Sequence, residues 1–446
     1  MAEHRIRETI GAILEKAPDA ARAYHSLPDD MRKRVIGGLD AHGLKTLTGL
    51  LKAAKKKSFT TADKRHIEIA AGLADTPVYL IDESLIEENM RILHYVKDRT
   101  GCKVLHALKS YATFATFPVM AEHLDGVCAS GINEARLGRE EFNKEVHTFG
   151  AAYKDSEIKG ILKYSDSIVF NSFYQLERYG AMARKRGLQI GLRVNPGYSE
   201  VEAEMYNPCA DRSRLGITHE IFNREFSKVK DIIEGIHFHA MCEQNSDVLE
   251  RILASFERLY GQYIKGLKWV NFGGGHHITR DDYDIERLIR LINNFRKRYG
   301  TGVYLEPGEA SVLKAGVLIS SVLDIIDNKG RVAVMDTSAE THMPDVLLMP
   351  YRPHIMGSGQ PGDKRHTYRV AGPTCLAGDI IGDYSFDRPL KRGDRLIFTD
   401  MALYSIVKNT TFNGINLPDI AVLREEGMLK LIKTFGYKDY RNRQSL

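Results

Sequence analysis

A lysine stands at the end of an apolar run near the start of the main body of the chain. The run is HALKS, and its lysine is Lys109. A lysine held away from water has a lowered pKa, and its neutral amine can form an imine with an aldehyde. Most lysines that follow a strand are merely exposed, so Lys109 becomes informative only together with its neighbours.

Three glycines and a carboxylate follow two later apolar runs. Gly273, Gly274 and Gly275 come after KWVNF, where residues without a Cβ atom let backbone N–H groups approach a phosphate. A tight structural turn would explain them equally well. Glu306 ends GVYLE ahead of a Pro-Gly pair, where a fixed carboxylate could keep a heterocyclic nitrogen protonated or simply pair with an arginine.

The run GIHFHAMCEQ places two histidines on one face of a predicted strand. His237 and His239 have the spacing that a metal could use, but no third ligand is evident. We therefore predict a core or cofactor-stacking role for these histidines and no metal site. Glu243 lies just past the same strand.

The C-terminal part of the chain contributes a cysteine, a tyrosine and several carboxylates. Cys375 and Asp379 lie in GPTCLAGD, Tyr404 lies in DMALYS, and Asp345 lies in MDTSAETHMPDV. An unpaired cysteine is usually inert core, yet the residues around Cys375 favour an exposed loop. The carboxylates suit either a polycationic ligand or an ordinary solvated surface.

Eight apolar runs between residues 75 and 310 indicate the elements that position these side chains. Helical stretches separate the runs, and this alternation predicts a closed parallel (β/α)₈ barrel. The runs are KVLHALKS, GVCAS, VHTFGA, SIVFNS, IGLRVN, GIHFHA, KWVNFGGG and GVYLEPG. Because barrel strands gather their carboxyl ends at one face, Lys109, His239, Gly273 and Glu306 are expected around one pocket.

The pattern of apolar and turn-forming residues divides the chain into three parts. Residues 1–74 have the apolar spacing of short amphipathic helices, and the run TPVYLID then opens the main body, so the barrel is predicted over residues 75–310. Residues 311–446 carry strands separated by Gly, Asp and Pro turns, which predicts a C-terminal β-domain. The predicted fold class is α/β, a TIM-like barrel with a β-domain and an N-terminal helical extension.

Composition excludes several classes of protein. Among the 446 residues, 43% are hydrophobic and 27% charged, as in soluble globular proteins, and no apolar run is long enough for a bilayer. A charged N-terminus without an apolar signal segment predicts a cytoplasmic protein. Five scattered cysteines favour reduced thiols over disulfides.

The positive charge is concentrated in the helical extension. Residues 1–74 hold 14 Lys and Arg against 9 Asp and Glu, an excess of 5 that equals the whole-chain net charge of +5. No nucleic-acid-binding surface is therefore expected on the main body. The basic residues of the extension could contact an acidic partner or form an ordinary solvated face; they include Lys52, Lys55, Lys56, Lys57, Lys64 and Arg65.

The order of the motifs resembles that of the fold-type III pyridoxal-phosphate decarboxylases, the ornithine and diaminopimelate decarboxylase superfamily. The shared order is a strand-end lysine, HFH, GGG, EPG, GPTC and a late aspartate–methionine–tyrosine run. The longer runs CEQNSD, GGGHHITR and GDIIGDYSFD resemble those of carboxynorspermidine/carboxyspermidine decarboxylases. This likeness extends from about residue 76 to the C-terminus, and the helical extension lies outside it.

The resemblance implies pyridoxal 5'-phosphate as cofactor and gives the motifs their roles. Lys109 would bind the cofactor covalently, His239 would stack on its pyridine ring, and Glu306 would pair with the ring nitrogen. The three glycines would bind the phosphate with help from Tyr404. The implied reaction is the decarboxylation of carboxynorspermidine or carboxyspermidine to norspermidine or spermidine in polyamine biosynthesis.

The resemblance also implies a homodimer with shared active sites. Cys375 and Asp379 resemble loop residues that a partner subunit inserts into the active site. There the cysteine would control protonation of the reacting carbon, and the acid would bind a distal amine.

One residue departs from the wider superfamily. Ornithine decarboxylases follow EPG with an arginine that supports the phosphate, whereas this chain has Glu309. A phosphate does not favour a nearby anion, so Glu309 is expected to turn toward an ammonium group of the substrate. Glu309, Asp345 and Glu243 are then predicted to bind the polyamine tail.

Two alternatives stay open at the level of sequence. One is another decarboxylase of the same mechanism, acting on diaminopimelate, ornithine, lysine or arginine. The other is a catalytically inactive relative that binds a partner through the helical extension. The sequence also leaves open which triamine is preferred, because one methylene changes binding by only about 1–3 kcal/mol.

Overall fold

The protein is described by a computed structural model. It covers residues 2–14, 29–40, 43, 46, 61–201, 204–424 and 427–445. The chain divides into two compact units, Met1–Gly72 and Leu73–Leu446. None of the described helices is both long and apolar enough to cross a membrane.

The first unit is helical over its described residues. Its helices are α1 (Ala2–Leu14), α3 (Asp29–Gly37) and α5 (Thr61–Gly72). Helices α1 and α3 lie in the segments whose apolar spacing predicts amphipathic helices, and their apolar residues Ile13 and Val35 are buried. Of the basic residues named above, Lys52, Lys55, Lys56 and Lys57 lie outside the described residues.

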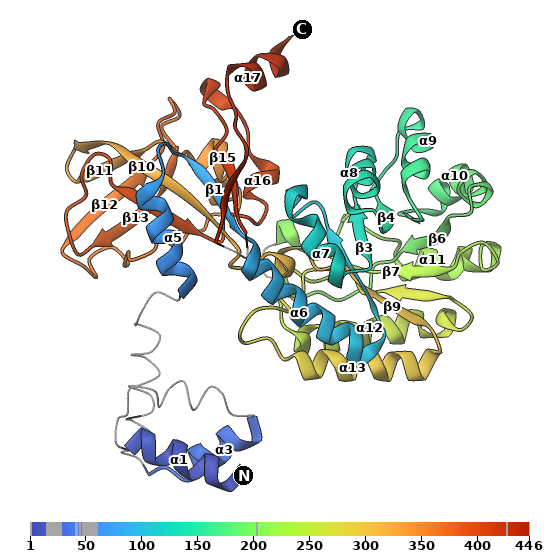
Figure 1. The fold of residues 1–446 in the computed structure, drawn as a ribbon. Coiled ribbons are helices and arrows are strands. Elements are labelled where there is room, and N and C mark those ends of the chain that lie inside the picture. The colour runs from blue at the N-terminus through green and yellow to red at the C-terminus, as the bar shows by residue number, and fades with distance from the viewer. Residues whose placement is uncertain are drawn as a thin grey trace. The chain divides into compact units, whose positions relative to one another are not determined.

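The second unit contains a closed barrel of eight parallel strands (Figure 1). All eight occur in the predicted runs, which confirms the predicted fold class. The strands are β2 (Lys103–Ala107), β3 (Gly126–Ala129), β4 (Glu145–Phe149), β5 (Ser167–Phe170), β6 (Gln189–Arg193), β7 (Gly235–His237), β8 (Trp269–Asn271) and β9 (Gly302–Leu305).

Helices surround the barrel, and local sequence signals set their ends. Asp82 caps the first of them by accepting a hydrogen bond from Ser84 N, and Gly101 ends it with φ 63°, a left-handed conformation that favours glycine. The helices are α6 (Glu83–Thr100), α7 (Phe117–His123), α8 (Ile132–Leu137), α9 (Asp155–Tyr164), α10 (Phe173–Lys185), α11 (His219–Glu225), α12 (Ser246–Ile264) and α13 (Ile285–Tyr299).

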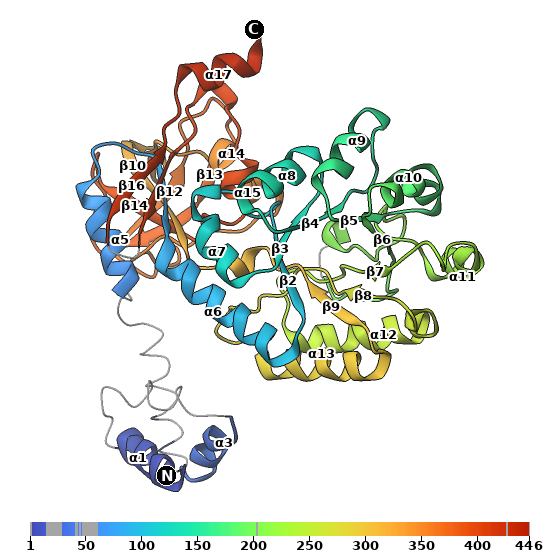
Figure 2. The same ribbon diagram turned by 45° about the vertical axis from the view of Figure 1, so that its right-hand side comes forward.

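A mixed sheet forms the β-domain (Figure 2). Its strands follow the order β13-β12-β11-β10-β1-β15-β16, and β14 also pairs with β10. They are β1 (Val78–Asp82), β10 (Gly316–Asp327), β11 (Arg331–Met335), β12 (His366–Ala371), β13 (Ile380–Phe386), β14 (Arg395–Thr399), β15 (Asp419–Leu423) and β16 (Leu429–Lys433). Four short helices accompany them: α14 (Ala339–His342), α15 (Asp345–Leu348), α16 (Ser405–Lys408) and α17 (Tyr437–Gln444).

Strand β1 belongs to the β-domain sheet, although its run TPVYLID was assigned to the barrel segment 75–310. It pairs antiparallel with β10 and parallel with β15. The second unit therefore starts in the β-domain, forms the whole barrel and returns to the β-domain. Ile81 of β1 and Val422 of β15 share a buried hydrophobic cluster with barrel residues, so the two parts are packed together.

Candidate active site

The parallel strands bring their carboxyl ends to one mouth of the barrel. Lys109 follows β2, His239 follows β7 and Glu306 follows β9. Burial lowers the pKa of His239, and the nearby ammonium of Lys109 lowers it further. The side chains predicted to share a pocket thus lie at the same mouth.

Glu306 is a buried carboxylate with two side-chain partners. Asn271 Nδ2 donates to its Oε1 over 2.7 Å, and His237 Nε2 lies 3.2 Å from its Oε2. Burial alone would raise the pKa of Glu306, but the contacts with His237 and Asn271 outweigh burial and lower it to about 2. A carboxylate that stays charged at neutral pH can keep a ring nitrogen protonated.

Steric contacts require glycine at all three positions of the GGG run. A Cβ atom at Gly273, Gly274 or Gly275 would lie 2.5, 2.2 or 2.0 Å, respectively, from a carbonyl oxygen of a neighbouring segment. Gly273 and Gly275 also have positive φ angles of 72° and 81°. The tight turn is by itself a sufficient reason for three glycines.

Two of the three glycine N–H groups have partners within the protein. Gly273 N donates to Asn271 Oδ1 and Gly274 N donates to His239 Nδ1, each over 2.8 Å. Among the described residues, the N–H of Gly275 has no comparable partner. Gly275 therefore fits a phosphate through its N–H, whereas Gly273 and Gly274, also predicted to bind it, use their N–H groups to fix neighbouring side chains.

Tyr404 reaches the barrel mouth from the β-domain. Its backbone N–H donates to the carbonyl oxygen of Ser110 over 2.8 Å, one residue from Lys109. Burial, followed by the charge of Glu309, raises the pKa of its phenol. The hydroxyl stays protonated and can donate to a phosphate oxygen.

An acidic cluster lies beside the glycine turn. Glu243, His277 and Glu309 place their ligand atoms within 4.8 Å of one another, and His277 Nε2 lies 2.8 Å from Glu309 Oε2. Burial and the charge of Glu309 both raise the pKa of Glu243. A divalent cation could occupy this set, although no metal was predicted; an organic ammonium group would relieve the same repulsion.

Asp345 belongs to the surroundings of this cluster. Its charge contributes to raising the pKa values of Glu243 and Tyr404. Lys408 forms an ion pair with Asp345. Glu243, Glu309 and Asp345, three of the acids predicted to bind the substrate, thus lie in one region, and Asp345 is paired there with Lys408.

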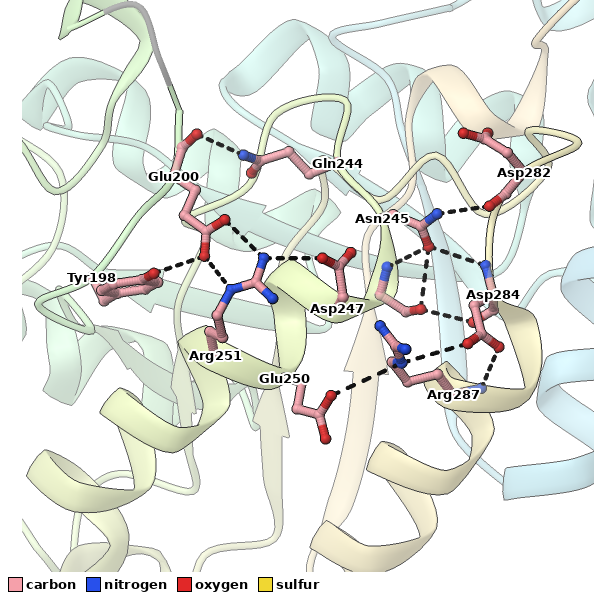
Figure 3. A network of polar contacts seen from close by, with 11 residues as sticks. Tyr198, Glu200, Gln244, Asn245, Asp247, Glu250, Arg251, Asp282, Asp284 and Arg287 are labelled. Carbon is pink, nitrogen blue, oxygen red and sulfur yellow. Dashed lines mark hydrogen bonds and ion pairs between the residues drawn. The ribbon is translucent and has the colours of Figure 1, made fainter.

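Hydrogen bonds fix the loop that carries Glu243 (Figure 3). Asn245 Oδ1 accepts from Ser246 N over 2.7 Å and from Asp284 N over 3.0 Å, and its Nδ2 donates to Asp282 O over 2.7 Å. These bonds connect CEQNSD to the loop after β8 that carries His277. The family-specific runs CEQNSD and GGGHHITRDDYD are therefore parts of one scaffold.

A second set of contacts holds the other side of the same loop. Gln244 Nε2 donates to Glu200 O over 2.8 Å, and Arg251 joins the Glu200 carboxylate to that of Asp247. Figure 3 shows this arginine between the two acids. The backbone of Glu243 has a positive φ of 54°, which is uncommon for a residue with a side chain, and the surrounding bonds hold it there.

The Asn245→Ala variant tests this scaffold. We expect the free energy of unfolding to fall by about 1–2 kcal/mol, since Asn245 also caps α12. We also expect a higher KM, because the loop carrying Glu243 loses its fixed position. Asn293→Ala, which removes one exposed hydrogen bond to Arg99 O, is the matched control for urea unfolding and steady-state kinetics. Equal effects of the two changes would contradict the scaffold role.

Asp379 is a buried carboxylate whose two oxygen atoms have partners in its own chain. It is 3% exposed, and its Oδ1 accepts from Ser338 Oγ over 2.9 Å and from Ala339 N over 2.8 Å. Its Oδ2 accepts from Thr374 Oγ1 over 2.7 Å. Both oxygen atoms of Asp379 thus bind groups of its own chain, and the binding of a distal amine in a partner subunit's site stays a prediction.

Cys375 is exposed at the tip of the loop that Asp379 holds. Its backbone N–H donates to Asn413 Oδ1 over 2.7 Å, which fixes the loop from the other side. No described contact joins Cys375 to Lys109 or Glu306 of the same chain. The thiol is thus presented outward on an ordered loop.

Sequence reasoning missed two residues of the site, Asn271 and His277. Asn271 is fully buried within an apolar strand, and His277 lies in the loop after the glycine turn. An uncharged polar residue on the same strand face as Gly273 was the available signal for Asn271. No comparable signal distinguished His277 from the neighbouring His276.

A family model described as "Pyridoxal-dependent decarboxylase, C-terminal sheet domain" matches residues 56–402. A Campylobacter jejuni carboxynorspermidine/carboxyspermidine decarboxylase is 43% identical over 377 residues, which cover 82% of this chain and 97% of that protein. A Synechocystis carboxyaminopropylagmatine decarboxylase is 40% identical, covering 82% of this chain and 95% of that protein.

The crystal structure of Campylobacter jejuni carboxynorspermidine decarboxylase complexed with norspermidine has a TM-score of 0.77 and 41% identity to this chain. It covers 83% of this chain and 100% of its own. The chain belongs to the pyridoxal-dependent decarboxylases. It is a carboxy-lyase with pyridoxal phosphate as cofactor, and its relatives of about 40% identity act on carboxylated polyamines, as their names state.

Proposed function

We propose that the protein decarboxylates carboxynorspermidine, carboxyspermidine or both, yielding norspermidine and spermidine in polyamine biosynthesis. The observation that carries this proposal is the cluster of Glu243 and Glu309 beside the glycine turn. The charge of Glu309 adds to burial in raising the pKa of Glu243, and two such neighbouring carboxylates form a favourable site for an ammonium group on an extended chain. The 43% identity to a carboxynorspermidine/carboxyspermidine decarboxylase supports the same substrate class.

We assign the cofactor residues from their positions at the barrel mouth. Lys109 supplies the amine that binds the cofactor, and Glu306 holds the proton on the ring nitrogen. Tyr404 and the N–H of Gly275 bind the phosphate, and His239 packs against the ring. Bound pyridoxal phosphate supplies an electron-accepting ring that stabilises the charge left when carbon dioxide departs.

We assign substrate recognition to Glu309 and Glu243, with His277 holding Glu309 in place. Ammonium groups along the substrate supply positive charge between these acids. Asp345 adds negative charge nearby, reduced by its ion pair with Lys408. Short amino acids such as ornithine carry fewer ammonium groups and gain less from this cluster.

We further propose a cytoplasmic homodimer with two shared active sites. A second copy of the chain inserts Cys375 into the barrel mouth, where the thiol delivers a proton to the carbon that has lost carbon dioxide. The exposed, fixed position of Cys375 on its loop supports this assignment.

A second candidate substrate is carboxyaminopropylagmatine, because a relative that acts on it is 40% identical. Its tail ends in a guanidinium group, which carboxylates bind as readily as an ammonium group. The discriminating experiment compares kcat/KM for carboxynorspermidine, carboxyspermidine and carboxyaminopropylagmatine with that for diaminopimelate, ornithine, lysine and arginine. Highest kcat/KM on any amino acid of the second group would overturn the proposal.

Replacing Glu309 by glutamine tests the acidic cluster. We expect KM for carboxynorspermidine to rise by more than about tenfold, because a charge-assisted contact contributes about 1.5–3 kcal/mol. Glutamine keeps the shape and can still accept from His277, so the change removes mainly charge. Glu286→Gln on the outer surface of the barrel is the matched control. An unchanged KM for Glu309→Gln would remove the role assigned to Glu309.

Removing divalent metal is a companion measurement. The cluster could bind a cation, yet recognition of an ammonium group requires none. We expect activity on carboxynorspermidine to be unchanged after dialysis against a chelator, and added zinc to inhibit by competing with the substrate. A loss of activity on chelation that zinc restores would instead indicate a metal-dependent site.

A further inference from the structure

Two buried side chains bind both oxygen atoms of the Glu306 carboxylate. His237 on β7 and Asn271 on β8 are direct partners in the parallel register, and Glu306 follows the next strand, β9. The strand register therefore places both residues beside Glu306. Neither residue is assigned a role in the function proposed above.

Asn271 can make its contacts in only one orientation. Its Oδ1 accepts from Gly273 N over 2.8 Å, so its Nδ2 faces Glu306 Oε1 and donates to it over 2.7 Å. The same side chain thus connects the glycine turn to the carboxylate. A movement of the turn would change the position of the carboxylate as well.

His237 holds the other oxygen. It is 2% exposed, and burial lowers its pKa, which favours the neutral ring. Because a carboxylate can only accept, the contact with Glu306 Oε2 requires the proton on Nε2. Among the described residues, Nδ1 of His237 has no hydrogen-bond partner. The contact with Glu306 is therefore the one hydrogen bond that the His237 ring makes to a described residue.

We propose that Asn271 and His237 are positioning residues that keep the Glu306 carboxylate charged and aimed at the ring nitrogen of pyridoxal phosphate. The inference rests on the proposed role of Glu306 in binding that nitrogen. Without the two donors, burial would favour the protonated acid, which cannot stabilise a positively charged ring nitrogen.

The test uses holoenzyme reconstituted with pyridoxal phosphate that carries an isotope label on the ring nitrogen. Nuclear magnetic resonance of that nitrogen reports its protonation directly, and dialysis measures the affinity for the cofactor. The variants are Asn271→Leu, His237→Phe, His237→Gln and Glu306→Gln. Asn293→Leu, on the outer helix α13, is the control for making the same substitution elsewhere.

Asn271→Leu keeps nearly the same volume but removes the amide donor to Glu306 Oε1. We expect Glu306 to take up a proton, the ring nitrogen to lose its own, and the dissociation constant for the cofactor to rise by at least about tenfold. His237→Phe should move the nitrogen signal in the same direction, and His237→Gln, which can donate, should restore it. Asn293→Leu should match the wild type.

The variants test the role proposed for Glu306 and the positioning roles of Asn271 and His237 separately. If Glu306→Gln leaves the ring nitrogen signal unchanged, the role proposed for Glu306 is wrong. If Glu306→Gln moves the signal but Asn271→Leu and His237→Phe do not, only the inference about positioning is wrong. Thermal unfolding of each variant identifies any that fail to fold. If His237→Phe does not fold, His237→Gln decides whether His237 positions Glu306. A folded His237→Gln protein without the wild-type nitrogen signal would overturn the inference.

Discussion

The Lys109→Ala variant is expected to lose more than about 10³-fold in kcat/KM, because it removes the amine that binds the cofactor. It should also lose the visible absorbance of the bound cofactor, even with pyridoxal phosphate in excess. Absorbance and steady-state decarboxylation of carboxynorspermidine measure the two effects.

The matched control for Lys109→Ala is Lys103→Ala. Lys103 is the first residue of β2, the strand that Lys109 follows, and its ammonium pairs with Glu145. The control should retain the absorbance and nearly all of the activity. If Lys109→Ala kept wild-type activity, or if both variants lost the cofactor equally, the barrel mouth would not be the site of chemistry.

Mixing two inactive variants should restore activity if the active sites are shared between two chains. Lys109→Ala lacks the cofactor amine, and Cys375→Ala lacks the thiol that a second copy would supply. In an equal mixture after subunit exchange, half of the dimers are mixed and each holds one intact site of two. We therefore expect about a quarter of the wild-type activity.

The mixing experiment needs a measure of subunit exchange. Mass spectrometry of intact complexes, with one variant carrying a tag, shows whether mixed dimers form. Mixed dimers with no more activity than the two parent variants would contradict a shared site. Cys375 is exposed on a loop fixed by Asp379 and Asn413, as a site shared between two chains would require.

The barrel could be predicted from the sequence because its strands have a local signal. Each is a short apolar run, and polar residues such as Lys109 and Glu306 come directly after the run ends. The partners of TPVYLID have no such signal, since its pairing with β10 and β15 joins segments far apart in the chain. A local pattern indicates that a strand forms but not which sheet it joins.

The roles of individual polar residues were harder to predict than the strands. The sequence around Asp379 predicts a loop acid but not its hydrogen bonds, since its partners Ser338 and Ala339 lie in a distant part of the sequence. Asn271 is the opposite case, since it stands inside an apolar strand, where its hydrogen bonds to Glu306 and Gly273 could not be predicted. Both outcomes depend on contacts that form only when separate strands and loops are packed.

The measurement that tests the central claim most directly is covalent mapping of the cofactor. The holoenzyme is reduced with borohydride, digested and sequenced by mass spectrometry. We predict a single pyridoxyl-phosphate modification, on the peptide that contains Lys109, and its absence from Lys109→Ala. A modification on a different lysine, or none at all in an enzyme that still decarboxylates, would contradict the assignment of Lys109 and Glu306 to one cofactor.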